Sequence, residues 1–154
     1  MNKIIAIVGM CGSGKSIASD ILVEKGFQKV YFGGVTMDKL KEKNLEITPE
    51  NEKEMREKLR EDLGMAAFAK ILLPKIQELV RDNDVVLDGL YSWDEYQFLE
   101  KELGKTMKTI AIVTDKKLRY KRLSEREIRP LTKSEAKSRD LAEIDNIAKA
   151  PPIA

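Results

Sequence analysis

The sequence predicts a three-layer α/β domain in which helices flank a central parallel sheet. Three short apolar runs predict buried strands, because each is rich in β-branched residues and apolar at consecutive positions: 3–8, 84–87 and 109–113. Long helical patterns separate these runs, as expected when crossover helices join parallel strands. The chain has 154 residues, about the length of one domain, and it contains no internal repeat or linker.

The first half of the chain contributes two helical stretches and one weaker strand. A helix is predicted over 15–25 with Gly26 as its stop, and the strand follows over 28–32. Thr48 and Pro49 are suitable residues to open a long helix that starts near residue 50. Gly64 and Pro74 are candidate break or kink points in it. Its apolar stripe has a spacing of four residues: Met55, Leu59, Leu63, Ala67 and Ile71.

Two helices are predicted in the second half. One covers 93–103 and is closed by Gly104. The other begins after Asp115, a good N-cap residue, and should end near Arg129, because Pro130 disfavours helix at the residue before it.

Composition excludes several classes of function. The chain has no histidine, which rules out histidine-based acid–base catalysis and histidine-ligated zinc. Its net charge of +2 argues against a general nucleic-acid or membrane-surface binder, and no apolar stretch has the length of a membrane span. Cys11 is the single cysteine, so no intramolecular disulfide can form. We therefore expect a cytoplasmic protein.

Residues 9–16 read GMCGSGKS and match the Walker A pattern G-x-x-x-x-G-K-[ST] between a predicted strand and a predicted helix. Glycines let such a loop curl so that its amide hydrogens point at phosphate oxygens, and the positive end of the following helix adds to that field. The lysine reaches the β- and γ-phosphates, and the last hydroxyl ligates Mg²⁺. The motif predicts ATP and Mg²⁺ binding, with these nucleotide-binding residues: Gly9, Gly12, Ser13, Gly14, Lys15, Ser16 and Ile17.

Asp88 ends a buried strand and is a second candidate. Groups at the carboxyl end of a strand beside the Walker A strand face the ligand crevice of a parallel sheet. A carboxylate there could hold Mg²⁺ together with Ser16, or accept a proton from an attacking hydroxyl. The alternative is a plain Asp-Gly turn.

Four arginines recur at spacings of three, four and three, which predicts one helical face: Arg119, Arg122, Arg126 and Arg129. Guanidinium groups gathered in this way suit phosphate oxygens. The alternative is a solvated face in which Glu125 pairs with its neighbours, and for Arg119 both interpretations stay open. Arg129 and Arg139 flank the break at Pro130 and predict a mobile lid. The candidate catalytic residues are Lys15, Asp88, Arg122, Arg126 and Arg129.

The arrangement resembles the small-molecule P-loop kinases, the group that holds nucleoside monophosphate kinases and dephospho-CoA kinase. The resemblance covers nearly the whole chain and rests on GMCGSGKS, VVLDG, YKRLSER and REIRPLTKSEAKSRD. It is closest to adenylate-kinase-like or dephospho-CoA-kinase-like proteins of bacteria and archaea. It implies a single P-loop kinase-like domain over 1–154, with an acceptor-side helical insert at 33–82 and a lid at 127–150 whose arginines clamp the transferring phosphoryl group.

The chain departs from that family where the acceptor binds. Nucleoside monophosphate kinases carry D-G-[FY]-P-R, whereas in this chain Asp88-Gly89 is followed by Leu90-Tyr91-Ser92. The arginine of their acceptor loop is also missing here, where the chain has Thr36-Met37-Asp38. Dephospho-CoA kinases carry an Asp just after the second strand, where this chain has YFGG. The acceptor and the choice between ATP and GTP therefore stay open.

The chain also ends earlier than its family. Either this member is trimmed or the sequence is a piece of a longer one. If residues beyond 154 are absent, 109–113 is expected at the edge of the sheet, where unpaired backbone groups would allow self-association.

Two functions follow as hypotheses. The first is an ATP- and Mg²⁺-dependent phosphotransferase that moves the γ-phosphoryl group to a small-molecule acceptor, either dephospho-CoA or a nucleoside monophosphate. The alternative is a nucleotide-binding P-loop module or switch with little or no kinase activity. Both hypotheses take a nucleotide as ligand and no membrane partner, and the basic charge confined to the lid region argues against nucleic acid.

Overall fold

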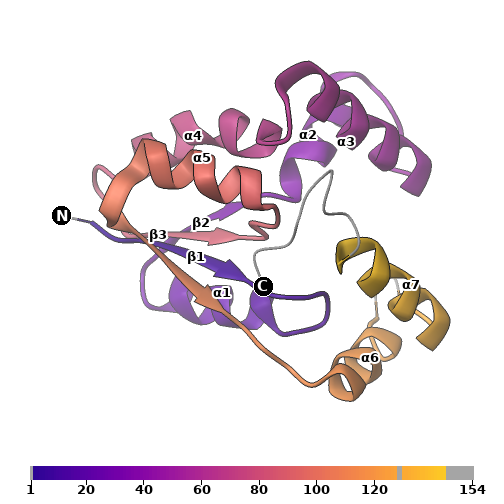
Figure 1. Ribbon diagram of the computed structural model, residues 1–154. Coiled ribbons are helices and arrows are strands. Elements are labelled where there is room, and N and C mark those ends of the chain that lie inside the picture. The colour runs from indigo at the N-terminus through magenta and orange to yellow at the C-terminus, as the bar shows by residue number, and fades with distance from the viewer. Residues whose placement is uncertain (1, 128–129, 145–154) are drawn as a thin grey trace.

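The computed structural model describes residues 2–127 and 130–144, which fold into three layers around a parallel sheet (Figure 1). The strands are β1 (Ile4–Val8), β2 (Gln28–Tyr31), β3 (Val85–Asp88) and β4 (Met107–Ala111). Their order is β2-β3-β1-β4, and each pairing is parallel. The predicted α/β P-loop NTPase fold is therefore confirmed, with β1 between β3 and β4. Strand β4 begins and ends two residues earlier than the range 109–113 that its apolar run predicted.

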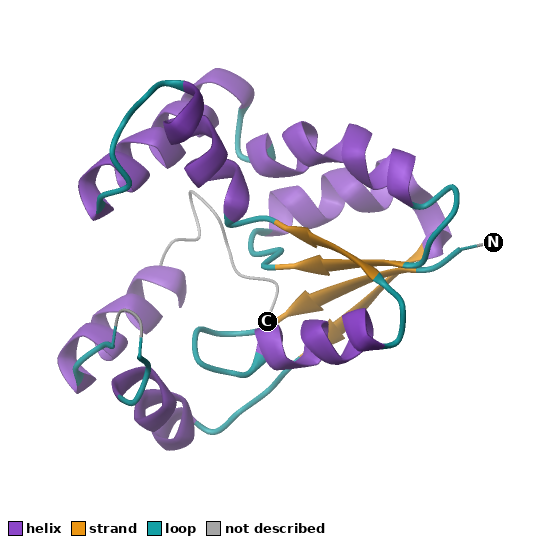
Figure 2. Cartoon of the chain, turned by 180° about the vertical axis from the view of Figure 1, so that it is seen from behind, coloured by secondary structure: helices purple, strands orange, loops and turns teal. Residues whose placement is uncertain are grey.

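Helices cover both faces of this sheet (Figure 2). On one face, α1 (Lys15–Glu24) packs against β1, β2 and β3. On the other, α4 (Ala67–Leu79) and α5 (Trp93–Leu103) pack against each other. The main core fills the space between the strands and the helices of that second face, with Ile4, Leu87 and Ile76 among its fully buried side chains. Because every residue of β3 and the last three residues of β1 are buried, the carboxyl ends of these two strands are held rigidly side by side.

The insert after β2 contains two further helices, α2 (Gly34–Glu42) and α3 (Pro49–Leu63). The Thr48 side chain caps α3, and Gly64 at φ 83° separates it from α4, as the sequence indicated. Helix α4 instead continues through Pro74. Helix α2 was not expected, because its Gly-Gly start reads as a turn. A Cβ on Gly33 would lie 2.4 Å from the Tyr31 ring, so glycine is needed for the close approach there.

In the second half of the chain, the observed elements up to β4 agree closely with those predicted from the sequence. Ser92 and Glu95 form a reciprocal capping box that opens α5. The helix ends at Gly104, where a short 3₁₀ helix (Gly104–Thr106) leads into β4. Because the capping box follows closely after Asp88, it also fixes the loop that leaves the end of β3.

Helix α6 (Lys116–Ser124) is shorter than predicted, and α7 (Lys133–Ile144) follows it. The Leu131 amide donates to the Leu123 carbonyl, and the Ser124 hydroxyl donates to the carbonyl of Lys121. Because the returning chain takes a carbonyl that a longer helix would use, the helix ends five residues before Arg129. The expectation of four arginines on one helical face is therefore wrong: Arg119 and Arg122 lie on α6, and Arg126 lies beyond it.

Strand β4 forms one edge of the sheet in the described part of the chain. Its side chains from Lys108 to Ala111 are exposed. Self-association through this edge stays a prediction. None of the described helices is long and apolar enough to cross a membrane.

Candidate nucleotide and phosphoryl-transfer site

The Walker A loop connects β1 to α1 at the carboxyl end of the sheet. Gly9 has a φ of 148°, and a Cβ there would lie 2.5 Å from the Ile112 carbonyl oxygen, so a side chain is excluded. Gly14 has a φ of 103° and precedes the first residue of α1. Because the first amides of a helix have no partner within it, the amides at 14–16 are available to an anion at the positive end of α1.

Lys15 folds back over its own loop. Its Nζ donates to the Gly9 carbonyl at 2.6 Å and to the Met10 carbonyl at 3.0 Å. Burial lowers the pKa of Lys15 from its ordinary value, although nearby Cys11, Glu143 and Asp88 oppose this. The ammonium group thus already lies at the loop, bound to weak neutral acceptors that phosphate oxygens could replace.

The other predicted loop residues lie around the start of α1. Ser16 and Ile17 are exposed in its first turn, while Ser13 is buried. The Ser13 hydroxyl is one of the buried polar groups without a hydrogen-bond partner among the described residues. The backbone carbonyl of Ser13, in contrast, accepts hydrogen bonds from Thr114 Oγ1 at 2.8 Å and from Arg122 at 3.2 Å. The loop is therefore held from the β4–α6 side as well as from α1.

Asp88 ends β3 directly beside β1, with Ile7 as its partner in the register. Its side chain is only 4% exposed, and Oδ2 makes two contacts: with Lys29 Nζ at 2.9 Å and with Ser19 Oγ at 3.0 Å. The Ser19 hydroxyl also bonds the Ser16 carbonyl at 2.9 Å. Asp88 is therefore tied to the turn that carries Ser16, rather than to a local Asp-Gly turn.

Lys29 is shared between two carboxylates, since it also pairs with Asp20 at 2.9 Å. Its burial opposes the charged form, but the hydrogen bonds to Asp88 and Asp20 outweigh this and raise the pKa of Lys29. Ser19 lies three residues after Ser16 on a helix, so helical spacing could have identified it. Nothing in the sequence distinguishes Lys29 from other strand lysines, because its role depends on β2 pairing with β3.

The donor set at this end of the sheet fits Mg²⁺. Hydroxyl and carboxylate oxygens are hard ligands, and Mg²⁺ is usually held by one or two protein groups together with substrate phosphates. Ser16 and Asp88 would supply those two groups. Among residues 2–127 and 130–144, no cluster of three or more acidic, cysteine or histidine side chains forms a self-sufficient metal site.

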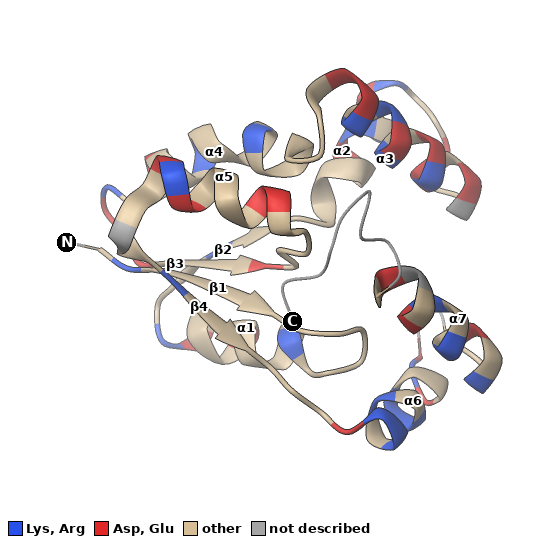
Figure 3. Ribbon diagram, viewed as in Figure 1, with Lys and Arg blue, Asp and Glu red and all other residues tan. Residues whose placement is uncertain are grey.

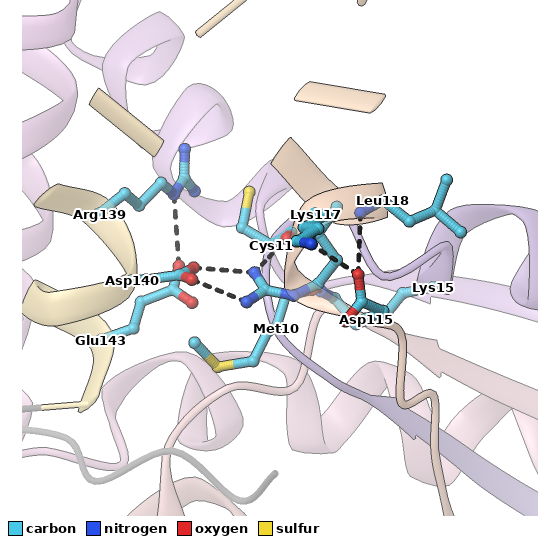
Figure 4. Close-up of polar contacts among 10 residues, drawn as sticks. Met10, Cys11, Lys15, Asp115, Lys117, Leu118, Arg139, Asp140 and Glu143 are labelled. Carbon is cyan, nitrogen blue, oxygen red and sulfur yellow. Dashed lines mark hydrogen bonds and ion pairs between the residues drawn. The ribbon is translucent and has the colours of Figure 1, made fainter. Parts of the chain in front are cut away.

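Arg119 does not face the loop as a free cation. Its guanidinium forms a bidentate ion pair with Asp140 of α7 at 2.8 and 2.7 Å, and it donates to the Cys11 carbonyl at 3.1 Å (Figure 4). Both side chains of the pair are less than 10% exposed. The Asp140 bond raises the pKa of Arg119, and the same bond lowers the pKa of Asp140. Arg119 therefore has a structural role, which joins α6, α7 and the Walker A loop.

Arg122 and Arg126 do lie at the loop. Arg122 Nη1 donates to the Ser13 carbonyl, and it would be 3.6 Å from a Cβ on Gly14. Arg126 Nη2 lies 3.5 Å from Cys11 Sγ. Arg129 lies outside the described residues. Basic side chains gather on α6, whereas α3 and α7 carry both signs of charge (Figure 3).

Further ionisable side chains follow Asp88 on the side of the insert. Tyr91 is half-buried, and burial raises its pKa to about 12, with Glu143 adding to the effect. Burial also raises the pKa of Glu95, although its bonds to the Ser92 backbone oppose this. Arg60 of α3 is in electrostatic range of both. No signal in the sequence singles out Arg60, because it is one of two arginines on a highly charged helix.

Comparison with known proteins gives consistent matches. The family model described as an AAA domain matches residues 5–143. A UPF0200 protein of Thermococcus onnurineus is 36% identical over 125 residues, which are 80% of this chain and 68% of that protein. Another, of Hyperthermus butylicus, is 35% identical over 144 residues, covering 92% and 75%. A UPF0200/UPF0201 protein of Archaeoglobus fulgidus is 37% identical over 125 residues, and this chain spans 39% of its length.

Solved structures share the fold at low sequence identity. The protein TT1252 from Thermus thermophilus superposes with a TM-score of 0.61 at 19% identity, covering 97% of this chain and 86% of that one. A gluconokinase from Sinorhizobium meliloti gives 0.54 at 13% identity, covering 89% and 72%. At such identities these matches show the α/β fold alone and leave the substrate open. The chain thus belongs to the AAA-domain family of P-loop proteins and, by its similarity to the archaeal sequences, to the UPF0200 family.

Proposed function

We propose that the protein is an ATP- and Mg²⁺-dependent phosphotransferase that moves the γ-phosphoryl group to a small acceptor, either dephospho-CoA or a nucleoside monophosphate. The observation that carries this proposal is the joint position of Lys15 and Asp88. Lys15 lies on the loop at the end of β1, and Asp88 ends the adjacent β3 and is bonded through Ser19 to the Ser16 turn. A phosphate-binding cation and a metal-binding carboxylate thus share one edge of the sheet.

The loop would bind the donor through its backbone. Amides of the first turn of α1 donate to the β- and γ-phosphates, and Lys15 exchanges its carbonyl acceptors for phosphate oxygens. Ser16 and Asp88 would hold Mg²⁺ with the phosphates, and the ion when bound neutralises their charge. Because both contacts of the Asp88 carboxylate use Oδ2, its Oδ1 is the oxygen available for a metal-bound water or an acceptor proton.

Transfer needs positioning and charge neutralisation more than covalent chemistry. The bond between the γ-phosphorus and its bridging oxygen breaks as an acceptor oxygen bonds to phosphorus, and ADP leaves. Arg122 and Arg126 would stabilise the charge that develops on the transferring group, since both already lie against the loop. Arg129 is proposed for the same role from the sequence.

One observation favours a second candidate, a nucleotide-binding switch without kinase activity. The segment after Asp88 carries Leu90, Tyr91 and Ser92 where an acceptor arginine would be expected, and Lys29 already neutralises Asp88. A switch would bind ATP–Mg²⁺ but form ADP at a rate independent of any acceptor.

The deciding experiment is a coupled assay of ADP formation. Purified protein with ATP–Mg²⁺ is tested against the four nucleoside monophosphates and dephospho-CoA, with Lys15→Met as the inactive control. A kinase shows acceptor-dependent ADP formation that Lys15→Met abolishes. ATP binding without acceptor dependence supports the switch, and absence of ATP binding contradicts both.

A further inference from the structure

The segment that follows β4 lies along the Walker A loop and contacts it at two points. The Ile112 amide donates to the Val8 carbonyl at 2.9 Å, so the parallel pairing with β1 continues one residue past β4. A Cβ on Gly9 would lie 2.5 Å from the Ile112 carbonyl oxygen, so the two chains approach closely there. Two residues further on, Thr114 Oγ1 donates to the Ser13 carbonyl at 2.8 Å. The pairing of the strands thus sets the place of the Thr114 hydroxyl beside the loop.

The Ser13 carbonyl accepts from two side chains on this side of the loop. The bond from Thr114 Oγ1 has the usual length of an O–H···O bond, whereas the bond from Arg122 Nη1, at 3.2 Å, is at the long end of the N–H···O range. A threonine has a single stiff torsion between its backbone and its hydroxyl, while a guanidinium lies at the end of a long side chain. Thr114 is therefore the donor that fixes the carbonyl more firmly.

The direction of this carbonyl decides where the next amide points. A peptide bond is planar and trans, so its C=O and its N–H point to opposite sides. With the Ser13 carbonyl turned toward Thr114, the N–H of Gly14 points away from the segment that follows β4. Gly14 is the residue before α1, and its φ of 103° is one that a side chain rarely allows. The bond from Thr114 therefore sets the direction of an amide at the positive end of α1.

This bond differs from the other bonds to loop carbonyls in how it should respond to a ligand. Lys15 donates to the carbonyls of Gly9 and Met10, and phosphate oxygens should replace both acceptors. Arg122 is proposed to act on the transferring phosphoryl group, so its bond to the loop is also open to exchange. The Thr114 hydroxyl carries no charge that a phosphate would attract, and it can stay on its carbonyl throughout the reaction.

We propose that Thr114 is a positioning residue of the nucleotide site: its hydroxyl holds the Ser13 carbonyl so that the Gly14 amide donates to the β-phosphate. This inference rests on the proposed function and adds to it a residue outside the Walker A motif. The Gly14 amide contacts the bound nucleotide before transfer as well as during it. Thr114 therefore acts on the affinity for the nucleotide and not on the rate of the transfer step.

The test measures binding to the Mg²⁺ complexes of ADP, of a non-hydrolysable ATP analogue and of pyrophosphate by isothermal titration calorimetry. Thr114→Val replaces the hydroxyl with a methyl group of similar size. It should weaken binding of all three ligands by about three- to tenfold, the effect of losing one hydrogen bond, because each ligand places a phosphate in the loop. Thr114→Ser keeps the hydroxyl and should restore the affinity to within about twofold of wild type.

Two further readouts separate positioning from a general loss of stability. The Gly14 amide signal in a ¹H–¹⁵N nuclear magnetic resonance spectrum should shift on saturation with ADP–Mg²⁺ in wild type and Thr114→Ser, and clearly less in Thr114→Val. In the assay of ADP formation, Thr114→Val should raise KM for ATP by the same factor as it weakens binding, and should leave kcat within about twofold. Thr114→Ala is a second variant without the hydroxyl, for use if the valine protein does not fold, and should show the same losses.

Ser124→Ala is the matched control. The Ser124 hydroxyl also donates to a backbone carbonyl at 2.8 Å, that of Lys121, but on the exposed surface of α6. Its loss should leave the affinity for all three ligands unchanged.

Equal affinity of Thr114→Val and wild type for the three ligands would overturn the inference. So would a Thr114→Ser protein that folds but binds as weakly as Thr114→Val, or a fall in kcat at unchanged KM. If wild type binds none of the three ligands, the nucleotide site and the proposed function both fail. If wild type binds them but forms ADP at a rate independent of any acceptor, only the proposed kinase activity fails, and the binding data still decide the role of Thr114.

Discussion

Lys15 is the residue whose surroundings most directly prepare it for a ligand. Its ammonium group is half-buried and bonded to two carbonyls of its own loop. The motif gives no information on where this side chain lies without nucleotide. Loop carbonyls are neutral acceptors, so phosphate oxygens should replace them with a gain in binding free energy.

Lys15→Met should therefore weaken ATP–Mg²⁺ binding by about 10- to 100-fold, since hydrogen bonds to charged groups contribute about 1.5–3 kcal/mol. The methionine keeps the stem, and the fold should be retained. Isothermal titration calorimetry measures the affinity, and circular dichroism checks the fold. Equal affinity in both proteins would show that Lys15 does not contact the phosphates.

A second prediction at the scale of single residues concerns Lys29. Lys29→Met removes the ion pair to buried Asp88 and should raise the Mg²⁺ concentration needed for half-maximal ATP binding several-fold, because the carboxylate loses the contact that orients it. It should also lower the free energy of unfolding by about 1–3 kcal/mol, less than a fully buried pair because Lys29 is 29% exposed.

Lys29→Arg and Lys39→Met are the controls for that effect. Arginine keeps the charge and should restore most of the Mg²⁺ dependence. Lys39 pairs with Glu42 at 2.7 Å on exposed α2, so its loss should change stability by about 0–1 kcal/mol and leave Mg²⁺ dependence unchanged. A Lys29→Met protein with wild-type or lower Mg²⁺ requirement would contradict the orienting role.

At the scale of elements, the contact between α6 and α7 depends on the buried pair of Arg119 and Asp140. A small apolar cluster lies beside it, formed by Cys11, Leu123 and Ala136 with Tyr120 and Leu131. The pair also bonds the Walker A loop through the Cys11 carbonyl. The position of α7, and with it that of Arg139, is therefore fixed to the loop by an ion pair that the sequence analysis did not find.

Asp140→Asn should lower the free energy of unfolding by about 3 kcal/mol, because it leaves the Arg119 charge buried and unpaired. Chemical denaturation measures this change. The Glu143→Gln protein is a suitable comparison, since Glu143 accepts from Arg139 on the same helix and the Arg139 side chain of this pair is 53% exposed, so its loss should cost about 1 kcal/mol or less. Similar losses in the two variants would show that burial of the Arg119 pair adds nothing.

The same pair gives a pH dependence with a defined sign. Because Arg119 lowers the pKa of Asp140, the unfolded chain binds a proton at higher pH than the native one does. The stabilisation is complete above the ordinary aspartate pKa of about 4 and is lost as the pH falls below it. Denaturation curves measured between pH 7 and pH 3 should therefore show that the free energy of unfolding falls more steeply in wild type than in the Asp140→Asn protein. If the free energy of unfolding falls equally with pH in both proteins, the ion pair of Arg119 and Asp140 does not contribute to the pH dependence.

Which elements could be predicted from sequence follows from where their determinants lie. Strand β1, helix α1 and helix α5 with its end at Gly104 carry local signals and were predicted correctly. Helix α6 ends early because the distant Leu131 amide takes one of its carbonyls, and α2 begins after Gly33, which lies close against the Tyr31 ring. The pairs of Asp88 with Lys29 and Arg119 with Asp140 depend on tertiary contacts, so no pattern along the chain could reveal them.

At the scale of the whole molecule, donor binding should couple the loop at the end of β1 to helices α1, α6 and α7. The Walker A loop contacts α1, the segment after β4, α6 and, through Arg119, α7. A ligand bound to the loop therefore stabilises contacts among all of these elements and not the loop alone. Because the ligand binds the native state and not the unfolded chain, the free energy of unfolding should rise with ligand concentration.

At an ATP–Mg²⁺ concentration of about 100 times Kd, this linkage adds about 2.7 kcal/mol. For a chain of this size the melting temperature should rise by roughly 5–10 °C. Differential scanning fluorimetry of wild type measures the shift, with ATP plus a chelator to remove Mg²⁺ and with Lys15→Met as controls. Both controls should give a clearly smaller rise, because one removes the Mg²⁺ that we propose Ser16 and Asp88 hold, and the other removes the ammonium group that we propose binds the phosphates. Hydrogen exchange then tests the coupling itself: if amides of α6 and of residues 133–144 gain no protection while those of α1 do, the ligand stabilises the loop alone and the ion pair of Arg119 does not carry its effect to α7.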